Sequence, residues 1–151
     1  MNTLKGAVDE VHGAKVYVYD SQITVILMGW LVLAAAQMAE AGKDPQAILA
    51  RLDDLRATMG EYFIVNDLQN LVRGGRLSNA SAFIGGMLKI KPLLTFDDQS
   101  HKIVAIEKIR SIKKAYARVE TLFQETLAKV DYPVRAVVIL SLIHISEPTR
   151  L

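Results

Sequence analysis

An almost uninterrupted apolar run, from Ile23 to Ala36, constrains the fold more than any other feature of the chain. Only Thr24 interrupts the run with a hydroxyl, and Glu40 follows soon after its Ala-rich second half. A membrane-spanning helix needs roughly 20 apolar residues, and this run has about 14. The run therefore predicts a buried core helix from about Val25 to Ala41, which Gly42 ends in a left-handed conformation.

Length and charge set the broad class of protein. The chain has 151 residues, enough for one domain with its own core. Its 18 basic and 16 acidic residues leave a formal charge of +2, far from the basicity of a dedicated nucleic-acid binder. The lack of cysteine excludes disulfides, thiol nucleophiles and cysteine zinc sites, and fits a cytoplasmic location. The first residues do not have the basic and then apolar build of a secretory signal.

Cap and turn residues divide the rest of the chain into alternating helices and strands. Asp44 and Pro45 form an N-cap and first-turn pair, whereas Gly60 and the Gly74–Gly75 pair are breaks. After Ser111, apolar residues recur at i, i+3, i+4 and i+7, which is typical of an amphipathic helix. The predicted helices cover residues 2–11, 25–41, 45–58, 66–73, 80–88 and 111–130, and the predicted strands 15–19, 62–65, 90–96, 102–107 and 134–139.

Together these elements predict an α/β fold in which helices pack against a mixed sheet. Pro92 indicates an edge or irregular strand position, because proline cannot donate a ladder hydrogen bond. The polar residues Asp97 to Ser100 predict a turn that makes a hairpin of its two neighbouring strands. The nearly all-apolar segment Val134 to Ile139 is suited to the middle of a sheet.

Arg76 is the first candidate binding residue. Gly74 and Gly75 precede it and permit positive φ, so we expect backbone amides and the guanidinium to converge on one point that suits an anion. A carboxylate or a phosphate would receive charge-assisted contacts there. The alternative is a simple helix stop whose arginine pairs with a local acid such as Asp67.

A second candidate is the apolar segment Phe83 to Leu88, which contains two adjacent glycines. The glycines could let an acyl chain pass close to the backbone of a helix, and a lipid tunnel needs such apolar walls. The residues alone favour an ordinary protein core instead.

A basic cluster, Lys108, Arg110, Lys113, Lys114 and Arg118, leads into the last helix. A cationic helix start opposes the helix macrodipole, which suggests docking to an acidic partner or a phosphate contact. The alternative is a solvated face.

Catalytic patterns are not evident. His12 and His101, the two histidines before residue 140, lie in polar turns without the pattern of a triad, and Asp97–Asp98 indicates a hairpin turn. The sequence has no metal-ligand spacing and no phosphate loop. We therefore interpret the chain as a binding module with no cofactor, and not as an enzyme.

Three motifs in fixed order carry a resemblance to a known family: Leu71–Val72–Arg73–Gly74–Gly75–Arg76, Ile90–Lys91–Pro92 and Glu107–Lys108–Ile109–Arg110. Together they resemble the second domain of the DegV family of bacterial fatty-acid-binding proteins. The resemblance covers about Lys15 to Ile139 and is strongest from Leu68 to Ala115. Near Asp20–Ser21 the family continues with small Ser and Gly residues, whereas this chain has apolar residues before Gly29.

The resemblance implies a non-catalytic carrier that binds a long-chain fatty acid in an apolar tunnel. It implies a partner fatty acid kinase subunit, of the dihydroxyacetone-kinase-like type, to which the lipid carboxylate is presented; nucleic acid is not an implied partner, and a transient membrane contact is compatible with the role. Arg110 and Lys113 would contact the kinase. The implied lipid-binding residues are Gly74, Gly75, Arg76, Ile84, Met87, Leu88, Ile90 and Leu94.

The resemblance also implies an incomplete two-domain protein, in which residues 1–139 form a DegV-like domain without the first domain. Residues 140–151 resemble one reading frame of a transposase adapter used in DNA library preparation, so we expect a non-native tail. Much of the head-group site would then lie outside this chain.

Two rival interpretations remain open. An anion, nucleotide or nucleic-acid binder would use Arg76 and the Arg110 cluster on one exposed basic face with aromatics free to stack. The third interpretation is a fragment with no function of its own.

Overall fold

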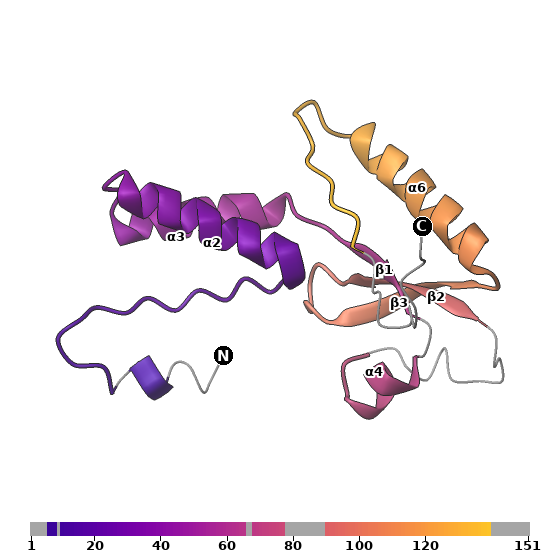
Figure 1. Ribbon diagram of the computed structural model, residues 1–151, viewed down its shortest axis with the longest axis horizontal. Helices are drawn as coiled ribbons and strands as arrows, with labels where there is room; N and C mark the ends of the chain where they lie inside the picture. Colours follow the sequence, from indigo (N-terminus) through magenta and orange to yellow (C-terminus); the bar gives the residue numbers. More distant parts are fainter. Residues whose placement is uncertain (1–5, 9, 66–67, 78–89, 140–151) are drawn as a thin grey trace, which may run out of the picture.

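The computed structural model describes residues 6–8, 10–65, 68–77 and 90–139. Figure 1 shows a helical hairpin beside a small sheet, with one helix on each side of that sheet. The hairpin consists of α2 (Val25–Glu40) and α3 (Pro45–Ala57); the sheet of β1 (Tyr62–Ile64), β2 (Lys91–Phe96) and β3 (Ile103–Ile109); and the flanking helices are α4 (Gln69–Arg73) and α6 (Ile112–Leu127). The predicted α/β class, with helices packed against a sheet, is confirmed.

The three strands pair antiparallel in the order β1-β2-β3. Parallel pairing, which a mixed sheet requires, is limited in the described part of the chain to an isolated bridge between Leu77 and Ile103. The predicted hairpin forms through the turn after Phe96. There the Asp97 carboxylate accepts hydrogen bonds of 2.7 Å from both the amide and the hydroxyl of Ser100, and these bonds lower the pKa of Asp97.

Pro92 lies in the central strand, in a stretch that has only one paired neighbour. The β1 pairing covers Leu93 to Thr95, so at Pro92 the ladder continues only to Lys108 of β3. The missing N–H of proline is therefore tolerated on the unpaired side. The strand is central and not an edge strand, Pro92 pairs with Lys108 in regular register, and the irregularity of the ladder lies next to it, between Leu93 and Leu94.

A β-bulge lies next to Pro92 in the β2–β3 ladder and changes which face of the sheet the side chains of β3 occupy. Leu93 lies opposite Glu107 and Leu94 opposite Ala105, which leaves Ile106 as the extra residue of β3. Ala105 packs in the core beside α4, whereas Glu107 bonds to α6. The bulge thus lets residues two apart on β3 serve opposite faces.

The helical hairpin follows its cap residues. The Asp44 carboxylate accepts from the amides of Gln46 (3.0 Å) and Ala47 (3.1 Å), and Pro45 occupies the first turn. At the end of α2, Gly42 has φ +71° and the Lys43 amide donates to the Met38 carbonyl, which completes a Schellman cap. These helix boundaries agree with the predicted ones to within a residue.

The prediction of a buried core helix is wrong for most of α2. Only Leu31 of this helix is buried, and the helix packs against α3. Val32 is 62% exposed and Leu33 58%. A single covering helix can bury only one stripe of a helix that is apolar on all sides.

The first and last predicted strands do not form. Residues 15–19 and 134–139 have no strand assignment, and most of them are exposed. A strand needs a pairing partner, and neither segment has one among the described residues. Residues 6–8 are helical, which supports part of the predicted helix over 2–11, and α6 ends at Leu127, before the predicted end. The predicted helix over 80–88 and the first two residues of the predicted helix over 66–73 lie outside the described residues.

Candidate functional site

The turn after α4 is a complete Schellman motif. Gly75 has φ +63°, the Gly75 amide donates to the Val72 carbonyl (3.0 Å), and the Arg76 amide donates to the Leu71 carbonyl (2.9 Å). The Gly74 amide is also used, by the Asn70 carbonyl. The prediction that backbone amides would face an anion here is wrong, because the helix end consumes them. Positive φ is needed at Gly75 but not at Gly74, whose φ is −79°.

The guanidinium of Arg76 is then the group left to meet an anion at this turn. Its side chain is exposed and lies over Gly74, where an added Cβ would come within 3.6 Å of Nη1. That Cβ would also lie 3.2 Å from the Asn70 carbonyl oxygen, so a glycine suits the position. No described acid forms an ion pair with Arg76, and Asp67, the acid proposed as its local partner, lies outside the described residues. The neighbouring Arg73 instead donates to Asn70 Oδ1 at 3.0 Å.

An apolar cluster begins at the residue after Arg76. Leu77, Leu94 and Ala105 are its buried members, and Leu94 is 0% exposed. Partly buried apolar residues of β1, β3, α4 and the adjoining chain pack against these three: Phe63, Val65, Leu68, Leu71, Val72 and Ile103. Arg76 therefore directly precedes, along the chain, an apolar layer between α4 and the sheet.

The predicted tail-lining residues are only partly placed by the structure. Leu94 belongs to the apolar cluster, and Ile90 is half-buried just before β2. Ile84, Met87 and Leu88 lie outside the described residues. The chain between Leu77 and Ile90 thus starts and ends at apolar positions beside the same sheet.

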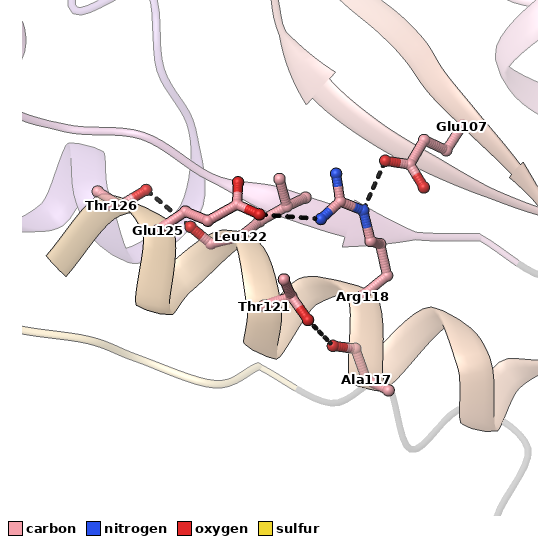
Figure 2. Close-up of polar contacts among 7 residues, drawn as sticks. All are labelled: Glu107, Ala117, Arg118, Thr121, Leu122, Glu125 and Thr126. Carbon is pink, nitrogen blue, oxygen red and sulfur yellow. Dashed lines mark hydrogen bonds and ion pairs between the residues drawn. The ribbon is translucent and has the colours of Figure 1, made fainter. Parts of the chain in front are cut away.

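The other face of the sheet carries an ion-pair network (Figure 2). Arg118 Nε of α6 lies 2.6 Å from Glu107 Oε1 of β3. Arg118 Nη1 lies 3.4 Å from Oε1 of Glu125, seven residues further along the same helix. The Glu107 hydrogen bond raises the pKa of Arg118 above its usual range. Sequence patterns do not show which residue of a strand pairs with which residue of a helix, so the sequence alone assigned Arg118 to the basic cluster.

The remaining residues of the basic cluster are exposed to solvent. Arg110, Lys113 and Lys114 are exposed around the start of α6, where the Ser111 hydroxyl accepts from the Lys114 amide at 3.3 Å. Lys108 is also exposed but has an interaction of its own. The predicted partner residues Arg110 and Lys113 therefore lie together at one end of α6.

A polar region beneath the β2–β3 turn was missed by sequence reasoning. An open cavity of about 290 Å³ lies between α3 and this turn, lined in part by Asp53, Arg56 and His101. Arg56 Nε donates to the Ser21 carbonyl at 2.8 Å, which ties the chain before α2 to α3. Burial, with a hydrogen bond to Asp53, raises the pKa of Tyr19 to about 12. The spacing of these residues gives no local pattern by which sequence reasoning could have found them.

Glu61 and His101 each have one buried polar side-chain atom in this region. Glu61 Oε1 and His101 Nδ1 are shielded from solvent and have no hydrogen-bond partner in the described part of the chain. Burial raises the pKa of Glu61, against an opposing effect from Arg56. Within the described ranges, no three acidic, histidine or cysteine side chains gather so as to hold a metal ion. Nor is any described helix long and apolar enough to cross a membrane.

Comparison with known proteins connects this arrangement to one family. A sequence model of the DegV family, described as "Uncharacterised protein, DegV family", matches residues 1–141. Protein DegV of Bacillus subtilis is 44% identical over 130 residues, which are 85% of this chain and 45% of DegV. The chain therefore spans less than half the length of this relative.

Solved structures agree with the sequence match. The crystal structure of DegV from Bacillus subtilis, described as a fatty acid binding protein, superposes with a TM-score of 0.71 at 41% identity, over 85% of this chain and 45% of that one. A fatty acid binding DegV family protein from Streptococcus agalactiae gives 0.73 at 35% identity, over 84% and 44%. A family member from Eubacterium eligens, loaded with heptadecanoic acid, gives 0.66 at 26% identity, over 83% and 45%. The chain belongs to the DegV family.

Proposed function

We propose that this chain contributes to the binding of a long-chain fatty acid, with Arg76 close to the lipid carboxylate. The observation that carries the proposal is the exposed side chain of Arg76, at the turn that leads directly into the apolar cluster of Leu77 and Leu94. A fatty acid has the same layout, with one anionic group attached to a long apolar tail. The solved relatives from Bacillus subtilis and Streptococcus agalactiae, described as fatty acid binding, support this choice of ligand.

The apolar tail would lie along the layer between α4 and the sheet. Each buried methylene contributes about 0.8 kcal/mol, so a long acyl chain draws most of its affinity from apolar walls. Ile84, Met87, Leu88, Ile90 and Leu94 are the proposed wall residues. Gly75 shapes the turn that leads to Arg76, and Gly74 leaves room for its guanidinium.

Matched substitutions of the two arginines at this turn test the proposal. Arg76→Gln removes the charge beside the apolar cluster, whereas Arg73→Gln removes a charge that already bonds to Asn70. A charged hydrogen bond contributes about 1.5–3 kcal/mol, so we expect Arg76→Gln to weaken oleate binding at least roughly tenfold in calorimetric titration. Arg73→Gln should bind as the wild type does. Equal oleate affinity of the wild type and both variants would show that Arg76 does not contribute to the binding site.

We further propose that the protein is a non-catalytic, cytoplasmic carrier that presents its lipid to a fatty acid kinase subunit. Arg110 and Lys113 are the proposed kinase contacts. Both are exposed at the start of α6, where positive charges interact unfavourably with the helix dipole. Replacing both by glutamate should slow kinase-dependent phosphorylation of the bound lipid without lowering the lipid content. An unchanged rate, measured with the same lipid content, would exclude this docking surface.

A further inference from the structure

Arg118 differs from the rest of the basic cluster because two carboxylates bind its guanidinium. Glu107 of β3 lies 2.6 Å from Arg118 and Glu125 of α6 lies 3.4 Å from it (Figure 2). Among the described residues, Arg110 and Lys113 form no such ion pair. A carboxylate next to a basic cluster lowers the positive potential of that cluster, which works against docking to an acidic partner. Charge alone therefore does not explain the position of Glu107.

The ion pair between Glu107 and Arg118 joins the two ends of the segment that carries the cluster. The two residues are 11 positions apart in the sequence. The positions between them include every other member of the basic cluster: Lys108, Arg110, Lys113 and Lys114. One end of this segment is the last part of β3, and the other is the first half of α6. The ion pair thus fastens the strand and the helix on either side of the basic turn.

The helix α6 buries little of its own apolar surface in the described part of the chain. Ala115 is its one buried residue, and Ile112 and Tyr116 are 39% and 55% exposed. Glu107 faces this helix because the bulge at Ile106 adds one residue to β3. A partly shielded ion pair between β3 and α6 is therefore well placed to set the position of the helix start on the sheet.

We propose that Arg118 is a positioning residue of the docking surface. Its ion pair with Glu107 holds the turn between β3 and α6 in one arrangement, so that the exposed basic side chains of this turn meet an acidic partner already ordered. A surface that is ordered before binding loses less conformational entropy when it binds. The inference rests on the kinase-docking surface proposed above, and it gives Arg118 and Glu107 a role in docking without contact to the partner.

Glu107→Gln separates positioning from direct contact, because the two roles predict opposite results. The full chain is titrated calorimetrically with a dihydroxyacetone-kinase-like fatty acid kinase subunit. If Arg118 positions the turn, Glu107→Gln and Arg118→Met each weaken binding at least roughly fivefold. If Arg118 itself contacts the acidic partner, Glu107→Gln frees a cation and removes an anion, so binding becomes tighter. Tighter or unchanged binding by Glu107→Gln would overturn the proposal.

Two further variants separate positioning from a general loss of stability. Arg118→Lys keeps a cation that can reach Glu107, so it should recover part of the affinity that Arg118→Met loses. Asp44→Ala removes the N-cap of α3, which lies away from α6 (Figure 1). This variant should bind the kinase subunit as the wild type does. A loss of affinity that Asp44→Ala shares with Arg118→Met would contradict the positioning role.

The docking surface itself has a separate test in the double variant Arg110→Glu, Lys113→Glu. If the double variant loses kinase binding while Glu107→Gln and Arg118→Met retain it, the docking surface stands and only the positioning role fails. If the double variant also binds as the wild type does, the docking surface fails and the positioning role fails with it.

Amide hydrogen exchange tests the positioning role without the kinase. Exchange of the amides of residues 108–114 should be at least roughly tenfold faster in Glu107→Gln and Arg118→Met than in the wild type, because the turn opens more often. Arg51→Met, which removes an exposed ion pair of α3, should leave this exchange unchanged. Equal exchange in all of these proteins would refute the proposal.

Discussion

At the scale of single residues, Gly75 shows most clearly how the backbone conformation restricts which amino acid can occupy a position. Its φ of +63° lies in the left-handed region, while the space around it is open. Gly75→Ala should therefore cost about 1 kcal/mol of unfolding free energy through backbone strain alone. Gly75→Asn should cost less, since asparagine tolerates this conformation. Gly60→Ala is the control, because Gly60 has equal space and no left-handed φ. Urea unfolding measures all three, and equal losses for Gly75→Ala and Gly60→Ala would contradict the account.

Glu61 makes a prediction about pH. Burial raises its pKa, so the folded protein holds the Glu61 proton more tightly than the unfolded chain does. The favourable effect of that proton is present at low pH and is lost as pH rises through the folded pKa. Glu61→Gln, which keeps the side chain neutral, should therefore raise the thermal unfolding midpoint at pH 7. The gain should shrink below about pH 4, where the wild-type carboxyl is protonated in both states.

Glu120→Gln is the control for this experiment, because Glu120 is an exposed glutamate on α6. Its midpoint should follow the wild type at every pH. A Glu61→Gln variant whose midpoint equals that of the wild type at pH 7 would show that the buried carboxyl carries no penalty.

Arg118 makes the third prediction at this scale. Its side chain is 33% exposed and lies 2.6 Å from Glu107, whereas the pair Arg51–Asp54 is 3.9 Å apart and 54% and 74% exposed. Exposed ion pairs contribute little, whereas removing one partner of a partly shielded pair leaves the other charge without compensation. Arg118→Met should lower the midpoint of urea unfolding, and Arg51→Met should leave it unchanged. Equal midpoints for the two variants would mean that the network in Figure 2 does not anchor α6.

At the scale of elements, local signals predicted the helices well. The cap residues Asp44 and Ser111 and the left-handed Gly42 act within a few residues of the chain, so sequence alone locates them. Strands depend on partners far away in the sequence. Residues 15–19 and 134–139 have strand-like composition but no described partner, and the prediction failed there for that reason.

The candidate site divides in the same way. The left-handed glycine could be predicted from the local Gly74–Gly75 pattern. The use of the Gly75 and Arg76 amides by the helix end could not, because only the hydrogen bonds reveal it. The pairing of Arg118 with Glu107 was also beyond prediction, because it joins a helix to a strand whose face is set by a bulge.

The N-cap of α3 gives a prediction for an element. The Asp44 carboxylate satisfies two otherwise unpaired amides of the first turn. Asp44→Ala should cost about 1 kcal/mol of unfolding free energy, and Asp44→Ser should restore most of the loss. Urea unfolding followed by circular dichroism measures both. A loss that serine does not recover would assign the effect to something other than capping.

At the scale of the whole molecule, the chain has two unequal parts. The sheet has an apolar cluster on its α4 face and packs against α6 on the other, while the helical hairpin leaves most of the large side chains of α2 in water. The chain matches less than half of the length of DegV from Bacillus subtilis.

Mass spectrometry of an organic extract tests lipid binding most directly. The sample is the purified protein, both alone and joined to the remaining part of DegV. We predict a long-chain fatty acid in near-stoichiometric amount in the joined protein, reduced by Arg76→Gln and retained by Arg73→Gln. A folded joined protein that is empty on purification, and still empty after incubation with fatty acids, would contradict the account.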